Sequence, residues 1–234
     1  MIAVTFALAA ESSGFRRRLH NKTRSDRNGI TTIAGHIDNC TVEVFHTGVG
    51  EEVCRQRTAR FLEGRKLDCL ISAGFAGALN DQLRIGDLLL AKNFSTPEVS
   101  GTLHSLANLP IHIANLLTVR SMIESGEDRN RLAQTTGAAA VDMETEFIAR
   151  ACAKHGVPLL SLRVISDTPG QPLPAPPNVL FDLDEQRTNF GILAVYLAKN
   201  PPAVWRLISF AHQIRRARER LSNAIIALVR ELRP

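Results

Sequence analysis

The sequence predicts an α/β fold with one large domain. Over the first two-thirds of the chain, short apolar runs alternate with stretches of helical periodicity, the pattern of strands and helices wound into layers. The 234 residues, 44% of them hydrophobic, are enough for a sizeable core. No internal repeat or second domain is seen, so we expect an α/β domain over residues 1–200. A final helix within residues 201–234 would pack on it or extend from it.

Strands are expected where short apolar runs occur. The first, residues 2–8, is almost continuously apolar. Glu11 stands where a signal peptidase would have to cut, so a strand is favoured over a secretion signal. The Gly/Ala-rich residues 73–79 are expected to form a loop. The other strands are expected at residues 29–36, 41–46, 67–73, 87–90, 116–119, 138–143 and 158–165.

Helices are expected where apolar residues recur every three or four positions. Gly64, Gly137 and Gly156 are suited to end three of them. Five of the ten residues from 168 to 177 are proline, so that segment should be an extended loop. The expected helices are residues 11–20, 51–64, 129–136, 145–155, 189–199 and 203–232.

The basic charge is concentrated in the last helix. The whole chain has a net charge of +5, and residues 203–234 hold seven arginines and two glutamates, which is also +5. Such a helix can pack on the domain with its arginines in solvent, or lie on an anionic membrane surface. Nucleic-acid binding is disfavoured because one Trp and one Tyr offer few stacking surfaces. No run approaches about 18 uninterrupted apolar residues, which excludes a membrane span.

Cysteine and histidine spacing argues against a disulfide framework and against a metal site. The four cysteines form no CxxC pair, so we interpret them as reduced residues of a cytoplasmic protein. The seven histidines show no metal-ligand spacing.

Two glycine-rich segments follow predicted strands, where ligands bind in open α/β sheets. They are Gly48-Val-Gly and Gly74-Phe-Ala-Gly. Both allow a ligand to approach the backbone closely, although each also suits a tight turn, and Phe75 also suits a core position. Neither has the GxGxxG spacing of dinucleotide-binding folds.

Two acidic residues also lie at predicted strand ends. Glu144 opens a helix after the strand at 138–143, and Asp167 follows the strand at 158–165. Their ordinary interpretations are a helix-dipole carboxylate and a turn-forming residue. Together, at sheet ends that face the same side, they would supply one acceptor for hydroxyl groups and one proton donor.

Five segments share their order and spacing with one enzyme superfamily. They are His46-Thr-Gly-Val-Gly-Glu, Ser72-Ala-Gly-Phe-Ala-Gly-Ala-Leu, Gly86-Asp-Leu, Ala140-Val-Asp-Met-Glu-Thr and Arg163-Val-Ile-Ser-Asp. They resemble the motif series of the nucleoside phosphorylase and methylthioadenosine/S-adenosylhomocysteine nucleosidase superfamily. The resemblance implies a three-layer αβα domain with a central mixed sheet. It also implies an enzyme that cleaves the N-glycosidic bond of a purine nucleoside.

The resemblance implies a role for each matching residue. Met143 would pack on the ribose, and Glu144 would accept hydrogen bonds from its two hydroxyls. Asp167, oriented by Ser166, would act at purine N7 as the base departs. No metal or cofactor is implied, apart from phosphate as a co-substrate in the phosphorylases. The rest of the nucleoside would lie near Phe75, Met122, Gly48, Gly50 and Gly74.

The attacking nucleophile stays open. Nucleosidases use a glutamate in the first loop to activate water, and an ungapped alignment places Ser13 there and Glu11 two residues earlier. Glu11 is the candidate base, although it also suits the first turn of a helix. Ser72 and Phe75 stand where phosphorylases bind phosphate. Phosphate would therefore need arginines from elsewhere in the chain or from a partner subunit.

Residues 132–174 and the arginine-rich final helix are similar to the hopanoid-associated branch of this superfamily. That likeness implies a nucleoside with a bulky apolar 5′ group, an adenosyl-hopanoid, cleaved at the cytoplasmic face of the inner membrane. It also implies a homo-oligomer, most simply a dimer. The departures at Ser13 and Phe75 leave an alternative of another class, a purine-binding or membrane-recruited module without catalysis.

Overall fold

A ten-stranded mixed sheet forms the centre of the computed structural model, which describes residues 1–100, 110–181 and 190–232. Eight strands follow the order β2-β3-β4-β1-β5-β10-β6-β7, and β9 joins β5 to β8. The strands are β1 (Ile2–Phe6), β2 (His20–Arg27), β3 (Ile30–Ile37), β4 (Cys40–His46), β5 (Cys69–Ala78), β6 (Leu88–Ala91), β7 (Ile111–Ala114), β8 (Leu116–Thr118), β9 (Ala140–Asp142) and β10 (Leu159–Asp167).

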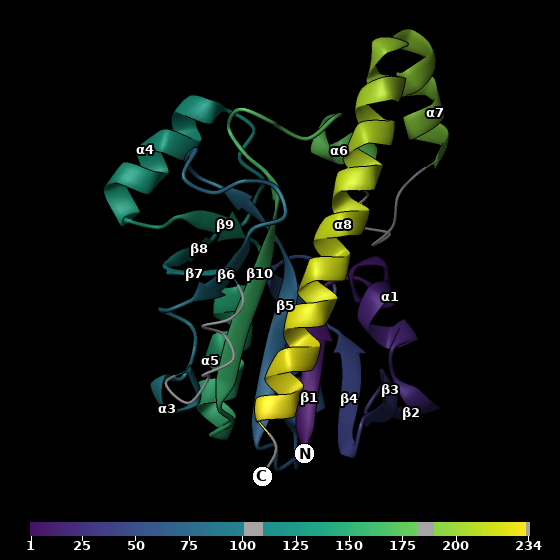
Figure 1. The fold of residues 1–234 in the computed structure, drawn as a ribbon, viewed down its shortest axis with the longest axis vertical. Coiled ribbons are helices and arrows are strands. Elements are labelled where there is room, and N and C mark those ends of the chain that lie inside the picture. The colour runs from purple at the N-terminus through teal and green to yellow at the C-terminus, as the bar shows by residue number, and fades with distance from the viewer. Residues whose placement is uncertain (101–109, 182–189, 233–234) are drawn as a thin grey trace.

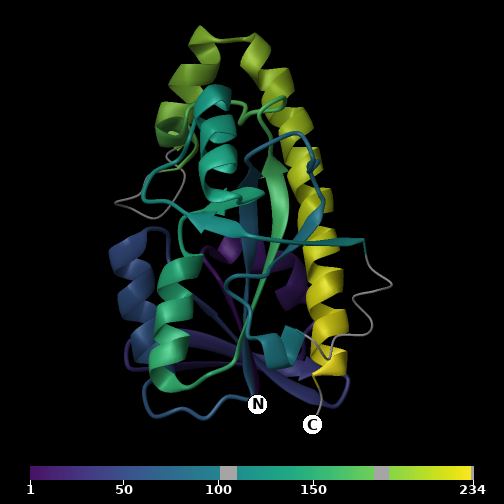
Figure 2. The same ribbon diagram turned by 90° about the vertical axis from the view of Figure 1, so that its left-hand side faces the viewer.

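Helices cover both faces of the sheet (Figures 1 and 2). α1 and α8 lie on one face, and α2 and α5 lie on the other. The α/β fold with a three-layer arrangement and a mixed sheet, predicted from the sequence, is therefore confirmed. The helices are α1 (Ala9–Arg17), α2 (Glu51–Leu62), α3 (Pro97–Ser100), α4 (Gly126–Thr136), α5 (Thr145–His155), α6 (Pro177–Leu180), α7 (Phe190–Lys199) and α8 (Pro202–Glu231).

β1 shows how one strand serves two cores. Its side chains alternate between the faces of the sheet, as the period of two requires. Ile2 and Val4 join the cluster under α1 and α8, whereas Ala3 joins the cluster under α2 and α5. β1 pairs in parallel with both β4 and β5, and all five of its residues are buried. A nearly continuous apolar run is the expected sequence for such a strand.

The two halves of α8 have different surroundings. From Ala217 onward its apolar residues belong to the core on the sheet, and Ile225 and Leu228 are fully buried. Two arginines of this half bind the domain. Arg218 donates to the Ala10 carbonyl oxygen at 3.0 Å, and Arg220 donates to the Gly86 carbonyl oxygen at 3.2 Å. Two of the basic residues expected to face solvent or a membrane therefore bind the domain instead.

Several expected boundaries were wrong. The Gly/Ala-rich residues 73–79 were expected to be a loop, but β5 continues through them to Ala78, because they pair with β10 on one side and with β9 on the other. The helix expected at 11–20 ends at Arg17, and β2 follows. The sequence did not indicate β2 or β7. All eight residues of β2 are exposed, so it has no apolar pattern to detect.

The remaining elements follow the sequence closely. α5 has the expected bounds, and Gly137 and Gly156 end α4 and α5 in the left-handed conformation. Residues 168–176 form a loop with one bridge between Thr168 and Gln171, and α6 follows. Asn189, expected to begin a helix, and Arg233, counted among the basic residues at the end of the chain, lie outside the described residues. Over the described part of the chain, every helix is too short or too polar to cross a bilayer.

Candidate active site

One cavity of about 530 Å³ lies where β1, β5 and β10 end and where β9 leads into α5. Two of the acidic residues on its wall, Glu144 and Asp167, come from the two sheet ends that the sequence indicated. The residues singled out from the sequence that line it are Glu11, Phe75, Met122, Met143, Glu144, Ser166 and Asp167. The structure therefore brings both carboxylates and their expected neighbours to one hollow.

Glu144 stands between β9 and α5. Its Oε1 accepts a hydrogen bond from the backbone N–H of Gly50 at 3.3 Å, which links it to the glycine segment before α2. Burial, followed by the charges of Asp142 and Glu11, raises the pKa of Glu144 to about 8. This carboxyl group is thus held next to other acids in a site with little solvent, and it binds a proton readily.

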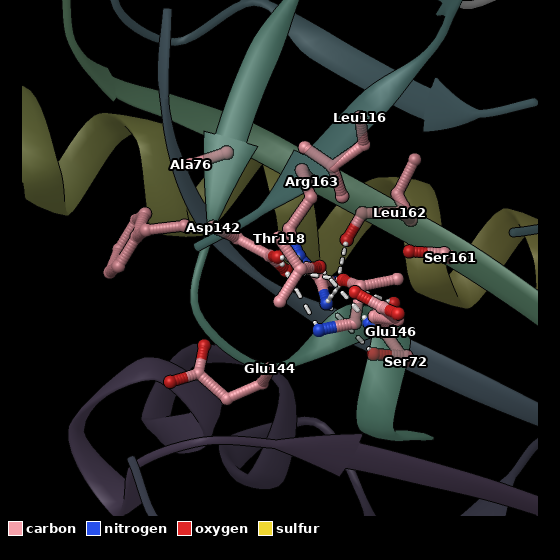
Figure 3. A network of polar contacts seen from close by, with 12 residues as sticks. Ser72, Ala76, Leu116, Thr118, Asp142, Glu144, Glu146, Ser161, Leu162 and Arg163 are labelled. Carbon is pink, nitrogen blue, oxygen red and sulfur yellow. Dashed lines mark hydrogen bonds and ion pairs between the residues drawn. The ribbon is translucent and has the colours of Figure 1, made fainter. Parts of the chain in front are cut away.

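A buried arginine fixes the β9–α5 junction that carries Met143 and Glu144. The Nε of Arg163 donates to Asp142 Oδ2 at 3.0 Å, and both side chains are almost fully buried. Its other donors bind the Ser72 carbonyl at 2.8 Å, the Ser72 hydroxyl at 2.9 Å and the Thr145 hydroxyl at 2.5 Å. Figure 3 shows this network. The carboxylate of Glu144 lies apart from the dashed contacts of Arg163. Removing one partner from such a buried pair typically costs about 3–5 kcal/mol.

Glu11 reaches the cavity from the first turn of α1. Its carboxylate accepts the backbone N–H of Leu8 at 3.0 Å and that of Phe75 at 3.3 Å. Burial raises the pKa of Glu11. Gly74 leaves room for it, since a Cβ there would lie 3.4 Å from Glu11 Oε1. Ser13, the other residue weighed for this role, donates instead to the Ala10 carbonyl and does not line the cavity.

Asp167 is bound from two sides. The hydroxyl of Ser166 donates to its Oδ1 at 2.6 Å, and the Nη2 of Arg129 donates to its Oδ2 at 2.6 Å. Arg129 is itself held by the carbonyls of Ile123 and Ala78, at 3.0 and 3.1 Å. One acceptor direction on each carboxylate oxygen is left for a ligand.

Arg129, the partner of Asp167, is a cavity residue that sequence reasoning missed. It is one of two arginines in α4, and nothing in the spacing separates it from Arg131, which is exposed. Gly77, the second glycine of the Gly74-Phe-Ala-Gly segment, was a usable signal that a bulky pair lies against β5. A Cβ on Gly77 would lie 3.1 Å from Asp167 Oδ2 and 3.2 Å from Arg129 Nη1. This glycine therefore leaves space for the ion pair.

The three glycines predicted to bind substrate, Gly48, Gly50 and Gly74, do not line the cavity. The backbone N–H of Gly50 donates a hydrogen bond to Glu144, and Gly74 makes space for Glu11. Gly48 has φ +78° and donates its N–H to the Ala7 carbonyl at 3.0 Å, so it shapes a turn. Their close backbone approach serves the carboxylates and the turn, and direct contact between these glycines and substrate stays a prediction.

The far wall of the cavity is apolar and comes from late in the chain. The sequence assigned no binding role to these residues. Over the described residues, Arg129 and Arg206 are the only arginines on the cavity wall, and no cluster of His, Cys, Asp and Glu suited to a metal ion is found. The apolar wall is formed by Pro172, Leu173, Pro174, Leu180, Phe181, Tyr196, Phe210 and Ile214.

Comparison with known families decides the relationship of this chain. Residues 2–105 and 95–199 match the sequence profile of the phosphorylase superfamily. The chain belongs to the phosphorylase superfamily. Among curated members, the 5′-methylthioadenosine/S-adenosylhomocysteine nucleosidase of Anoxybacillus flavithermus is 24% identical over 200 residues. The match covers 73% of this chain and 86% of that protein.

Solved structures of other superfamily members share the fold. The S. pneumoniae 5′-methylthioadenosine/S-adenosylhomocysteine nucleosidase has a TM-score of 0.73 at 19% identity, over 99% of both chains. A putative nucleosidase from Borrelia burgdorferi, bound to adenine, has a TM-score of 0.74 at 18% identity, over 98% of this chain and 99% of its own. Futalosine hydrolase of Helicobacter pylori has a TM-score of 0.63 at 21% identity, over 71% of this chain and 87% of its own. This phosphorylase-superfamily chain is an enzyme of the nucleosidase and phosphorylase kind, as the sequence predicts.

Proposed function

We propose that this enzyme hydrolyses the N-glycosidic bond of a 5′-substituted adenine nucleoside and releases adenine. The observation that carries the proposal is the meeting of Glu11, Glu144 and Asp167 on one cavity wall. These three residues supply a base, an acceptor for sugar hydroxyls and an acid. That is the set which displacement of a purine by water requires.

Each carboxyl group has a separate task in this reaction. Ionised Glu144 accepts hydrogen bonds from both ribose hydroxyls and holds the sugar beside Met143. Asp167 enters the step protonated and gives its proton to N7, while the bond between C1′ and the purine breaks and its electrons stay with the base. Asp167 is left as the carboxylate that Ser166 and Arg129 bind. Glu11 removes a proton from the water that attacks C1′. The positive charge of Arg129 beside Asp167 stabilises the departing purine further.

Water is favoured over phosphate as the nucleophile. Glu11, Glu144 and Asp142 place three acidic groups on the cavity wall at this side, and Arg163 beneath them is already bound to Asp142. A phosphate anion binds cationic and N–H donors, and the carboxyl groups at this side of the cavity offer it acceptor oxygens instead. The Ser72 side chain, at a phosphate-binding position of the phosphorylases, accepts from Arg163 instead.

Adenine release from 5′-methylthioadenosine, with and without phosphate, tests the activity and the nucleophile. We expect release that is independent of phosphate. Glu11→Gln should lower kcat about 100-fold or more, since general-base catalysis contributes about that much. Ser13→Ala, two residues away and off the cavity, should stay within about twofold of the parent enzyme. Release only with phosphate would indicate a phosphorylase, and saturable adenine binding without turnover would indicate a non-catalytic module.

The 5′ substituent is proposed to be bulky and apolar, as in an adenosyl-hopanoid. The apolar far wall of the cavity supports this, because it offers Leu173, Tyr196 and Phe210 where a polar group would find few partners. A series of 5′-alkylthioadenosines of increasing length tests it. The value of kcat/KM should rise with chain length, and a fall beyond methyl would contradict the proposal.

A homodimer working in the cytoplasm, with peripheral contact between the final helix and the membrane, completes the proposed setting. The arginine-rich helix and the family likeness support it. Light scattering during size-exclusion chromatography tests the dimer, and a monomer that retains full activity would rule it out.

A further inference from the structure

The helices α7 and α8 form a hairpin that stands beyond the end of the sheet. Figures 1 and 2 show α7 and the first turns of α8 at the end of the molecule opposite the N- and C-terminal residues. Asn200 and Pro201 connect the two helices. We call residues 190–214 the α7–α8 hairpin.

This hairpin exposes apolar side chains to an unusual degree. No residue of α7 is buried, although eight of its ten residues are apolar or aromatic by the sequence FGILAVYLAK. Phe190 and Trp205 are 78% and 76% exposed. Ten large apolar side chains are exposed among the described residues, and six of them are in the hairpin. These six are Phe190, Ile192, Val195, Val204, Trp205 and Ile208. Clustered exposure of this kind marks an interaction surface.

The charge on the same segment has one sign. Residues 190–214 contain no Asp or Glu, and they contain Lys199 and Arg206. Arg206 is exposed, and so is Arg216 just beyond the hairpin, whereas Arg215 pairs with Glu219 at 3.4 Å and Arg218 binds the domain. Exposed Trp and Phe beside cations are suited to the interface between lipid headgroups and acyl chains. Anionic headgroups attract such cations with about 1 kcal/mol each, while a protein partner would need acidic residues placed to match.

We propose that the α7–α8 hairpin docks this enzyme on the surface of an anionic phospholipid bilayer. Phe190, Val195 and Trp205 enter the headgroup region, and the basic residues face the lipid phosphates. The contact is peripheral, since neither helix of the hairpin is long and apolar enough to cross a bilayer. The docking element is therefore the exposed first half of α8 together with α7, and the second half of α8 stays on the sheet.

The hairpin also belongs to the wall of the cavity. Tyr196 from α7 and Phe210 and Ile214 from α8 line the cavity. A docked enzyme would consequently hold the apolar wall of its cavity close to the membrane, and a nucleoside with an apolar 5′ group could enter from the lipid. This second step rests on the proposed catalytic activity. The docking narrows the peripheral contact proposed above to one element of the fold and does not depend on catalysis.

Trp205 is the single tryptophan of the chain, so its fluorescence reports on the hairpin alone. We expect its emission to shift to shorter wavelength when vesicles of phosphatidylglycerol and phosphatidylcholine are added. Lipids brominated near the headgroup should quench it. Vesicles of phosphatidylcholine alone should give little shift, and high salt should weaken the response to anionic vesicles.

Variants separate the hairpin from the rest of the surface. Phe190→Ser with Val195→Ser should weaken sedimentation with anionic vesicles about tenfold or more, because two apolar anchors are lost. Ile113→Ser changes a side chain that is 66% exposed on β7 and should bind as the parent enzyme does. Equal loss in both variants would overturn the proposal. An unshifted Trp205 emission, or equal binding to neutral and anionic vesicles, would also overturn it. A shift of the emission that appears without lipid as protein concentration rises would overturn it too, and would indicate a dimer interface.

Two substrates keep the docking apart from the catalytic proposal. Turnover of 5′-methylthioadenosine in solution tests catalysis, and the Phe190→Ser/Val195→Ser variant should match the parent enzyme there. A 5′-alkylthioadenosine with a long chain, presented in anionic vesicles, should be cleaved about tenfold more slowly by this variant. If 5′-methylthioadenosine is not cleaved but the vesicles are still bound, the catalytic proposal fails and the docking stands. Unchanged cleavage from vesicles would overturn entry from the lipid.

Discussion

At the scale of single residues, burial and neighbouring acids set the protonation of Glu144. Glu144 lies near Asp142 and Glu11, and its pKa is raised to about 8, chiefly by burial. The folded chain therefore keeps a proton that the unfolded chain, with a pKa near 4.5, releases earlier. It follows that Glu144 lowers the stability of the fold as pH rises from 4.5 toward 8.

The first prediction concerns this loss of stability with rising pH. Glu144→Gln removes the charge and keeps an oxygen that can accept from Gly50. At about pH 9 the variant should be more stable than the parent enzyme by at least about 1 kcal/mol, and near pH 5 the two should be nearly equal. Urea unfolding at both pH values measures the difference. A difference of the same size at both would show that the charge of Glu144 is not its cause.

The activity should follow the same ionisation in the opposite direction. Only ionised Glu144 accepts hydrogen bonds from both ribose hydroxyls, so kcat/KM should rise as pH approaches about 8. Glu11 also has a raised pKa, so this limb of the profile belongs to the two carboxyl groups together. Glu144→Gln should reduce the rise of kcat/KM with pH. A profile for 5′-methylthioadenosine that is flat from pH 5 to pH 9 in the parent enzyme would contradict the assigned role.

Arg129 is predicted to position Asp167 and stabilise the leaving purine. Arg129→Met should lower kcat about 100-fold, and Arg129→Lys should restore part of it, because a charge beside Asp167 returns. Arg131→Met, in the same helix but exposed, is the matched control. A nucleoside with a more stable purine anion should lose less in Arg129→Met. A purely structural role would affect both nucleosides equally.

The sequence indicated the acidic residues of this site but not their partners. Glu11, Glu144 and Asp167 stand directly after predicted strands, and strand ends meet at one edge of a sheet, so their convergence could be predicted. Arg129 could not, because its role depends on where α4 docks, and that is set by contacts distant in sequence. The glycines were assigned to the ligand because sequence alone does not tell whether a ligand or a neighbouring side chain fills the space that a glycine leaves.

At the scale of elements, β5 carries the closest packing of the site. Gly77 faces the ion pair between Arg129 and Asp167, and Gly74 faces Glu11. Gly77→Ala should reduce both thermal stability and kcat, since its Cβ would lie 3.1 Å from Asp167 Oδ2. Gly74→Ala should be milder, because its nearest contact would be 3.4 Å. Thermal melts and steady-state rates of the two variants test this order, and a reversed order would contradict it.

Elements with a periodic or continuous apolar pattern were predictable, and elements without one were not. α5 matches its expected bounds because its apolar positions recur at helical spacing and Gly156 ends it. β2 escaped detection because it is held by pairing with β3 rather than by burial. β5 was cut short because Gly74 and Gly77 resemble a loop by composition, while the bonds from β10 make them a strand.

At the scale of the whole molecule, α8 joins two roles in one helix. Ile225 is fully buried in the core on the sheet, whereas Ile208 is 44% exposed in the hairpin. Ile225→Ala should lower the free energy of unfolding by about 2–5 kcal/mol. Ile208→Ala should change it by less than about 0.5 kcal/mol. Chemical denaturation measures both, and a similar cost for the two would mean that the hairpin is part of the cooperative core.

The position of α8 after the whole sheet in the chain has a consequence for biosynthesis. The strands β1, β5 and β10 leave the ribosome before the helix that covers one of their faces. Until α8 emerges, a nascent chain has α1 on that apolar face, and the area that α8 would cover is exposed to solvent. We expect ribosome-bound intermediates halted before residue 217 to recruit holdase chaperones, and intermediates extended past residue 231 to be released from them.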